Sequence, residues 1–218
     1  MSNISSENHL LLKKAIMSTV KYFDIFDYPL TAWEIWKYLY GKDGNMTYNF
    51  FDVCLILETL RDSGNLNTHF SFYFLPAREK IVDIRLERYS IAYTKYKKAK
   101  RIIKILALIP FVRMIGVMNT LSYSNARKGS DIDILIITES NKIWFVRFFT
   151  VSFLKIFRLR PNSKKRSDKI CLNFFLSLDG LNLREVALED SDIHFAHIIS
   201  DIVPIYDSGG IYERFFLE

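Results

Sequence analysis

The sequence contains little cysteine, glycine and proline, and it has no long apolar run. Its 218 residues include 2 cysteines, 8 glycines and 5 prolines. Two cysteines exclude a disulfide scaffold and a four-cysteine zinc site. No stretch reaches the roughly 18 uninterrupted apolar residues of a membrane-spanning helix, so we expect no membrane segment. The N-terminus lacks a basic region followed by an apolar one, so we expect no secretory signal and a cytoplasmic protein.

Two common phosphate-binding patterns are also absent, namely G-x-G-x-x-G and G-x-x-x-x-G-K-[ST]. Apolar and aromatic residues are abundant, at 50% and 15% of the chain, which is enough for a packed core. Lys and Arg number 30 against 24 Asp and Glu, giving a formal net charge of +6. This mild excess suits an anionic ligand such as a nucleotide, and it leaves nucleic acid as a weakly supported partner.

The hydrophobic pattern predicts two different halves joined by a long helix. Three helices and a short hairpin are expected within residues 1–80, in the order of a winged-helix-like helical domain. A connector helix is expected over residues 81–110, and Pro110 ends it. Residues 111–218 alternate strands with helices, which predicts a mixed β-sheet with flanking helices. The expected fold class is therefore α+β.

Apolar spacing and boundary signals define the expected elements. Thr31 and Glu34 form a capping-box pattern before one helix, and Ser191 is expected to cap the last one. Helices are predicted at 9–24, 32–40, 48–62, 79–108, 141–157 and 191–200, and strands at 66–68, 70–75, 111–118, 131–138 and 170–177. The expected apolar faces are Leu12, Ile16, Val20 and Phe23 in the first helix, Phe50, Val53, Cys54, Leu57 and Leu60 in the third, and Leu86, Tyr89, Tyr93, Tyr96, Ile103 and Leu106 in the long one.

Two acidic residues at a strand start have the clearest chemical meaning. Asp131 and Asp133 are two positions apart, so their side chains project from the same face of the predicted strand, opposite Ile132 and Ile134. Two such carboxylates repel each other unless a cation or a proton lies between them. Mg²⁺ takes oxygen ligands, often one or two carboxylates with substrate phosphates, so the pair is a candidate metal site for phosphoryl or nucleotidyl transfer. The alternative is a solvent-facing strand start.

The residues before this strand could hold a phosphate. Asn119 and Thr120 follow a predicted strand and begin a predicted helical turn, whose backbone N–H groups could bind phosphate oxygens. The hydroxyls of Thr120 and Ser122 could add hydrogen bonds, and Ser130 could orient the loop that carries Asp131. The order along the chain is therefore a phosphate cradle, a spacer and a pair of metal ligands.

This order resembles the nucleotidyltransferase fold of the DNA polymerase beta superfamily. That family carries Gly-Ser, a spacer of about ten residues and Asp-x-Asp on the next strand, and the spacer here is 121–130. The phrases YFDIFDYPLT (22–31), SDIDILIIT (130–138) and DKICLNFFLS (168–177) look like a group of uncharacterised bacterial and archaeal proteins with this domain. The resemblance covers most of the chain. It implies a nucleoside triphosphate substrate with Mg²⁺ or Mn²⁺ bound by Asp131 and Asp133.

The sequence departs from that family at two places. Asn119-Thr120 stands where the family has Gly-Ser, and a glycine lets a phosphate approach the backbone. The family's third carboxylate lies on a later strand, but the expected face of 170–177 carries Cys171, Asn173 and Phe175. Asn173 is the candidate third ligand, and Cys171 is interpreted as a small buried hydrophobe. The acids that flank this strand and could substitute are Asp168 and Asp179.

Basic residues concentrate in two stretches, Thr94–Lys104 and Lys155–Lys169, which hold thirteen of the 30. They predict either a surface for triphosphate or nucleic-acid backbone, or the solvated side of a helix and a loop. Arg61 is the only basic residue between Thr47 and Gly64, where a DNA-recognition helix would lie. The first domain is therefore expected to serve a structural or protein-contact role.

Three functions are compatible with these features. The first is a transferase that moves a nucleoside monophosphate from a triphosphate to an unspecified acceptor hydroxyl. The second is a catalytically degenerate domain of the same fold that binds a nucleotide or a partner. The third is a regulator that binds DNA through the winged helix. The relatives that the chain resembles are expected to be longer, so it could be a shortened member.

Overall fold

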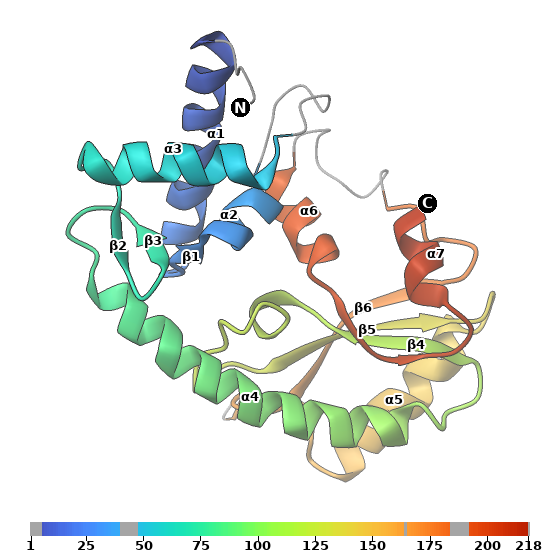
Figure 1. Cartoon of the computed structure of the whole chain (residues 1–218). Coiled ribbons are helices and arrows are strands. Elements are labelled where there is room, and N and C mark those ends of the chain that lie inside the picture. Colours follow the sequence, from blue (N-terminus) through green and yellow to red (C-terminus); the bar gives the residue numbers. More distant parts are fainter. Residues whose placement is uncertain (1–5, 40–47, 164, 184–191, 218) are drawn as a thin grey trace. The chain divides into compact units, whose positions relative to one another are not determined.

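The computed structural model describes residues 6–39, 48–163, 165–183 and 192–217 (Figure 1). The chain divides into two compact units, residues 1–87 and 88–218. The boundary lies within one long helix, α4 (Lys80–Leu106). Helices and two β-sheets together confirm the α+β fold class. The finer division into residues 1–80, 81–110 and 111–218 stays a prediction.

The first unit combines helices with a small antiparallel sheet. Its sheet has the strand order β1-β3-β2. The predicted apolar stripe of the first helix is confirmed, since Leu12, Ile16, Val20 and Phe23 are at most 3% exposed. The winged-helix assignment stays a prediction. The elements are α1 (Ser6–Asp24), β1 (Leu30–Thr31), α2 (Ala32–Lys37), α3 (Phe50–Asp62), β2 (Asn67–His69), β3 (Phe72–Phe74) and the first turns of α4.

Helix α2 begins at the predicted capping box. The Thr31 hydroxyl accepts a hydrogen bond from the Glu34 backbone N–H at 3.3 Å, and the Glu34 carboxylate accepts one from the Thr31 N–H at 2.8 Å. Arg85, in the first turns of α4, pairs with Glu34 at 2.6 Å and lies over the rings of Tyr28 and Phe72. The helix ends at Lys37, and the predicted end at residue 40 lies outside the described residues.

The predicted apolar faces of two other helices were partly wrong. In α3, Phe50 is exposed and packs on Trp33 and Trp36, while Ile56 is fully buried. In α4, the predicted stripe of large residues is exposed in its first half, where Tyr89 and Tyr93 face solvent. The buried face instead uses small and aliphatic residues, which let the helix approach the sheet closely. These are Ala92, Ala99, Ile102, Ile103 and Leu106.

The second unit is built on a four-stranded mixed sheet with the order β6-β5-β4-β7. Strands β5 and β6 are parallel, and β4 is antiparallel to both β5 and β7. The edge strand β7 and the helix α7 were not predicted, because Pro204 weakens the strand pattern. The elements are β4 (Val112–Val117), the 3₁₀ turn η1 (Asn119–Leu121), β5 (Ile132–Thr138), α5 (Ile143–Ile156), β6 (Ile170–Ser177), α6 (Ile193–Ser200), β7 (Val203–Asp207) and α7 (Ile211–Leu217).

Helices cover both faces of this sheet, and Figure 1 shows α5 and α7 on opposite sides of it. One core contains Ile132, Ile134 and Ile136 of β5 together with residues of α4 and α5. The other contains Leu135 and Ile137 together with residues of α7. This alternation follows from the two-residue period of a strand. None of the described helices is long and apolar enough to cross a bilayer.

Helix α6 has its N-cap at Asp192, one residue after the predicted cap. The Asp192 carboxylate accepts the hydrogen bond from the Phe195 N–H at 2.9 Å. Ser191 itself lies outside the described residues. Asp is as good an N-cap as Ser, so the sequence offered two candidates side by side.

Candidate functional site

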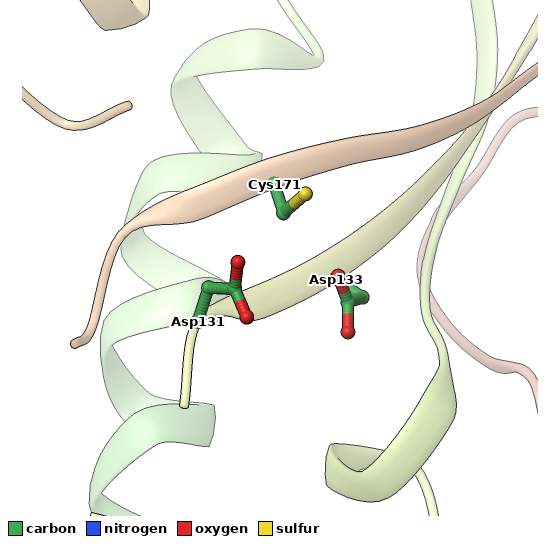
Figure 2. A group of neighbouring side chains, drawn as sticks. All are labelled: Asp131, Asp133 and Cys171. Atoms are coloured by element: carbon green, nitrogen blue, oxygen red, sulfur yellow. The ribbon is translucent and has the colours of Figure 1, made fainter. Parts of the chain in front are cut away.

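The two candidate metal carboxylates lie at the start of β5 and point to the same side (Figure 2). Asp131 immediately precedes the strand, and Asp133 is its second residue. Ile132 and Ile134 between and after them are fully buried in the opposite core. The pleat of β5 therefore holds the two acids together, because moving either one would take an isoleucine out of the core.

Cys171 is the third member of this group, although the sequence predicts only a small buried hydrophobe at this position. It lies opposite Asp133 in the parallel pairing of β5 with β6. Ligand atoms of Asp131, Asp133 and Cys171 all lie within 4.8 Å of one another, and Figure 2 shows these three side chains as neighbours on β6 and at the start of β5. Among the described residues this is the one group of three or more His, Cys, Asp or Glu side chains close enough to share a metal ion. The sequence alone could not predict this contact, because it depends on the register between β5 and β6.

Asn173, the predicted third ligand, lies beside Cys171, and its role as a ligand stays a prediction. The β5–β6 register shifts after Leu172, so Asn173 is an extra residue in β6 and is exposed. Its side-chain oxygen accepts a hydrogen bond from the Cys171 thiol at 3.1 Å. Asn173 thus contacts a member of the group. The shift also corrects the predicted face, because Phe175 packs on the other side of the sheet, in the core with Ile132.

The turn after β4 is joined directly to Asp133. Asn119 has a positive φ of 56°, and its side-chain amide donates a hydrogen bond to the Asp133 carboxylate at 3.0 Å. The Met118 N–H donates to the Asp133 carbonyl at 3.1 Å. The predicted phosphate-binding turn and the predicted metal ligands are therefore adjacent in space.

Hydroxyl groups in this turn are partly used within the chain. The Ser122 hydroxyl donates to the Asn119 carbonyl at 2.6 Å. The Thr120 carbonyl accepts the Asn125 N–H at 2.7 Å, and the Thr120 side chain is half-buried. The turn is a single three-residue 3₁₀ segment, so its dipole is small and a phosphate would depend on individual donors.

Lys95 anchors the loop that carries Asp131. It is 2% exposed on its side chain, and its ammonium group donates to the carbonyls of Ser130 at 2.7 Å and Lys128 at 3.3 Å. It also pairs with Asp168 at 2.6 Å. The predicted solvated face of the long helix is therefore wrong at Lys95. Ser130 contributes to the same loop, since its hydroxyl donates to the Arg127 carbonyl at 2.8 Å.

Asp168 and Asp179, the predicted substitutes for a third acid, lie outside the group. Burial alone would raise the pKa of Asp168, but the hydrogen bond and charge of Lys95 outweigh it and lower the pKa. Asp179 follows the far end of β6, where the Ser177 hydroxyl bonds to it and lowers its pKa.

The basic stretch Lys155–Lys169 reaches the site through Arg166. The Arg166 guanidinium pairs with the Asp131 carboxylate at 3.0 Å.

The group is electrostatically prepared for a cation. Burial raises the pKa of Asp133, and the charge of Asp131 raises it further, while the Asn119 hydrogen bond acts in the opposite direction. Burial and the charges of Asp133 and Asp131 raise the pKa of the Cys171 thiol to about 11. Both shifts in pKa come first from burial and secondly from neighbouring negative charge, and a divalent cation would relieve the second cause.

The three side chains are suitable ligands for a divalent ion, and the two carboxylates among them are suitable for Mg²⁺. Carboxylates such as Asp131 and Asp133 are the ligands that Mg²⁺ and Mn²⁺ prefer, with phosphate oxygens completing the shell. A thiolate suits ions such as Zn²⁺ instead. With Mg²⁺, Cys171 would remain a protonated neighbour, whereas a thiophilic ion would use it as a ligand.

Helix α3 of the first unit does not carry the basic surface that a DNA-recognition helix needs. Arg61 pairs with Asp62 at 2.9 Å, and the helix also carries Asp52 and Glu58. Negative charge on the helix that would enter the major groove disfavours DNA binding. The DNA-binding hypothesis stays without a supporting observation in this unit.

Comparisons with known proteins give a loose likeness to a solved structure. No protein-family model matches the chain, and the curated proteins contain no significant match. Among solved structures, the chain is similar to a protein from a crystal structure of a toxin–antitoxin with AMP-PNP. The sequence identity is 17% and the TM-score is 0.31, over 54% of this chain and 81% of that chain. At this TM-score the likeness does not define the fold, so the site is interpreted from its own geometry.

Proposed function

We propose that the second unit binds a nucleoside triphosphate with Mg²⁺ or Mn²⁺ and transfers a nucleoside monophosphate to an acceptor hydroxyl. The observation that supports this proposal is the meeting of three ligand side chains within 4.8 Å, next to the turn that begins at Asn119. The order of turn, spacer and Asp-x-Asp also resembles the nucleotidyltransferase fold.

Each residue of the site has a role in this proposal. Asp131 and Asp133 hold the ion, which would neutralise charge on the triphosphate. Thr120 and Ser122 are the hydroxyls proposed to bind phosphate oxygens, and Ser122 would give up its hydrogen bond to the Asn119 carbonyl to do so. Arg166 would exchange Asp131 for a phosphate, because a guanidinium binds both carboxylates and phosphates. The acceptor oxygen bonds to the α-phosphorus, the bond to the β-phosphate oxygen breaks, and pyrophosphate leaves with the acceptor proton released to solvent. Catalysis of this kind depends on positioning.

The test combines nucleotide binding with product release. Calorimetry with ATP, with and without Mg²⁺ or Mn²⁺, should show binding that requires the ion. Asp133→Asn should weaken ion-dependent binding by about tenfold or more, since even outer partners of a metal site change affinity 10–100-fold. Asp179→Asn is the matched control, because it removes an acid from the far end of β6. Equal ATP affinity in the wild type and Asp133→Asn would contradict the proposal.

A catalytically degenerate domain is the second candidate, and two observations favour it. Cys171 occupies the position opposite Asp133 where a third acid would help to hold an ion. The Asn119 side chain occupies the place of the family's glycine and is bonded to Asp133. This candidate predicts ATP binding without pyrophosphate release at any metal tested. Pyrophosphate release that appears only in Cys171→Asp would identify the missing acid as the reason.

A further inference from the structure

Helix α5 has one buried face and one exposed aromatic face. Val146, Thr150 and Leu154 point toward the sheet and are fully buried, and the Thr150 hydroxyl is satisfied by the Val146 carbonyl at 2.7 Å. The opposite face carries large apolar side chains with high exposure. These are Trp144 at 80%, Phe145 at 40%, Phe148 at 66%, Phe149 at 45% and Ile156 at 74%, followed by Phe157 at 60%. We call these six residues the α5 aromatic face.

Three rings of the α5 aromatic face, those of Phe145, Phe148 and Phe149, contact one another. Ring centroids are 4.6 Å apart between Phe145 and Phe149, and 5.4 Å apart between Phe148 and Phe149. Phe111, before β4, extends the row with a 5.3 Å contact to Phe145. A contiguous exposed apolar surface of this kind is typical of an interaction site.

Positively charged residues lie on α5 and in the segment that follows it. The segment from residue 141 to residue 167 contains eight Lys and Arg and no Asp or Glu. Lys155 and Arg147 lie on α5 itself, and Arg158 follows it; all three are exposed. Arg147 lies 6.0 Å from the Trp144 ring. Helix α5 therefore combines exposed aromatic side chains with exposed positive charge.

We propose that the α5 aromatic face docks on the surface of an anionic lipid bilayer, with the helix lying in the plane of the interface. Interfacial helices combine Trp and Phe on the lipid side with Lys and Arg that contact anionic headgroups. Helix α5 has 14 residues, a length of about 21 Å, which is too short to span the roughly 30 Å hydrocarbon core. It can lie on a bilayer without crossing it.

Charge and chemistry favour a lipid surface over other partners. A second copy of the chain would bring the same positive segment against itself, and like charges at short range oppose association. A nucleic acid would neutralise the charge, but it offers no apolar volume for the aliphatic Ile156 or for a whole face of phenylalanines. An anionic bilayer satisfies both requirements. The inference does not depend on the proposed transferase activity.

The test is co-sedimentation of the full chain with lipid vesicles. Vesicles of phosphatidylcholine with phosphatidylglycerol should bind the protein, and vesicles of phosphatidylcholine alone should bind it much less. Phe148→Ser should weaken binding by about tenfold or more, since a phenylalanine would no longer be buried. Phe51→Ser is the matched control, because Phe51 is 69% exposed in the first unit, and it should bind like the wild type.

Charge reversal separates lipid from other partners. Lys155→Glu should weaken vesicle binding by about fivefold or more, while Lys100→Glu, an exposed lysine of α4, should not. Loss of binding in Lys155→Glu without any change in Phe148→Ser, together with binding to a single-stranded oligonucleotide, would assign the surface to nucleic acid. A dimer in sedimentation velocity that Phe148→Ser dissociates, without vesicle binding, would assign it to self-association. Either result would overturn the lipid proposal.

Discussion

At the scale of single residues, Asn119 links the turn after β4 to the candidate metal ligands. Its φ of 56° lies in the left-handed region, which glycine and asparagine tolerate best. The Asn119 side chain donates a hydrogen bond to Asp133. The residue therefore combines a left-handed backbone with an amide group held against the candidate site.

Substitution of Asn119 should separate backbone strain from hydrogen bonding. Asn119→Ala puts a β-carbon without a polar group into the left-handed region, and the free energy of unfolding should fall by about 1–2 kcal/mol. Asn119→Gly loses the same hydrogen bond but accepts the backbone shape, so its loss should be clearly smaller. Urea denaturation of both variants measures the difference. Equal losses would show that the hydrogen bond, and not the backbone, carries the effect.

At the scale of elements, the pairing of strands decides which residues meet. The parallel register of β5 with β6 puts Cys171 beside Asp133, and Asn173 is the extra residue in β6 that contacts the Cys171 thiol. Helix α4 acts on the same site through Lys95, which holds the loop before Asp131. In the first unit, α4 acts in a similar way through Arg85, which secures the capping box of α2.

The Glu34–Arg85 pair should make the first unit sensitive to acid. Burial alone would raise the pKa of Glu34, but the hydrogen bond and charge of Arg85, with the bonds from Thr31, lower it below its usual value of 4.5. The stability that this pair provides is therefore complete above about pH 4.5 and is lost as the pH falls through the lowered pKa.

Glu34→Gln is the variant that tests this dependence. At pH 7 it should lower the free energy of unfolding by about 1–3 kcal/mol, since it leaves the Arg85 charge with weaker partners in a mostly buried place. At pH 3 the difference from the wild type should shrink. Thermal unfolding at both pH values measures it, and Glu58→Gln on α3 is a control. A difference that is the same at both pH values would rule out the pair as its source.

At the scale of the whole molecule, two units carry separate buried cores on one chain. The cores of the second unit contain residues after position 88, and the core under the hairpin of the first unit contains Phe74, Ile81 and Val82. The candidate site belongs to the second unit, as does the α5 aromatic face. A change in the core of the first unit should therefore act on stability without acting on ion or nucleotide binding.

Leu57→Ala tests this separation. Leu57 is fully buried in α3, so its truncation should cost about 2–5 kcal/mol. Hydrogen exchange should increase in residues 6–39 and 48–74, while calorimetry with ATP and Mg²⁺ should give wild-type affinity. Leu55→Ala, at an exposed position of the same helix, should change neither. Weaker nucleotide binding in Leu57→Ala would show that the first unit contributes to the site.

Much of the fold follows from local patterns in the sequence. The capping box at Thr31, the stripe of α1 and the alternation in β5 were all predictable, because each depends on residues within one element. The placement of Asp131 and Asp133 on one face of the strand was predictable for the same reason. Local patterns failed to predict strand β7, which contains a proline, and the buried face of α4, where tyrosines of the predicted stripe are exposed. In both elements, packing against the sheet outweighs local propensity.

The sequence by itself determined that two acids share a strand face after a turn, since that needs only the two-residue period of β-structure. Only the tertiary structure decided the third member, because register between strands is set by long-range packing and by the extra residue in β6. It also decided that Lys95 is buried and that the aromatic side of α5 is exposed. The sequence shows that aromatic and basic residues are present in this segment. Only the folded structure shows which of their side chains are exposed and can contact a partner.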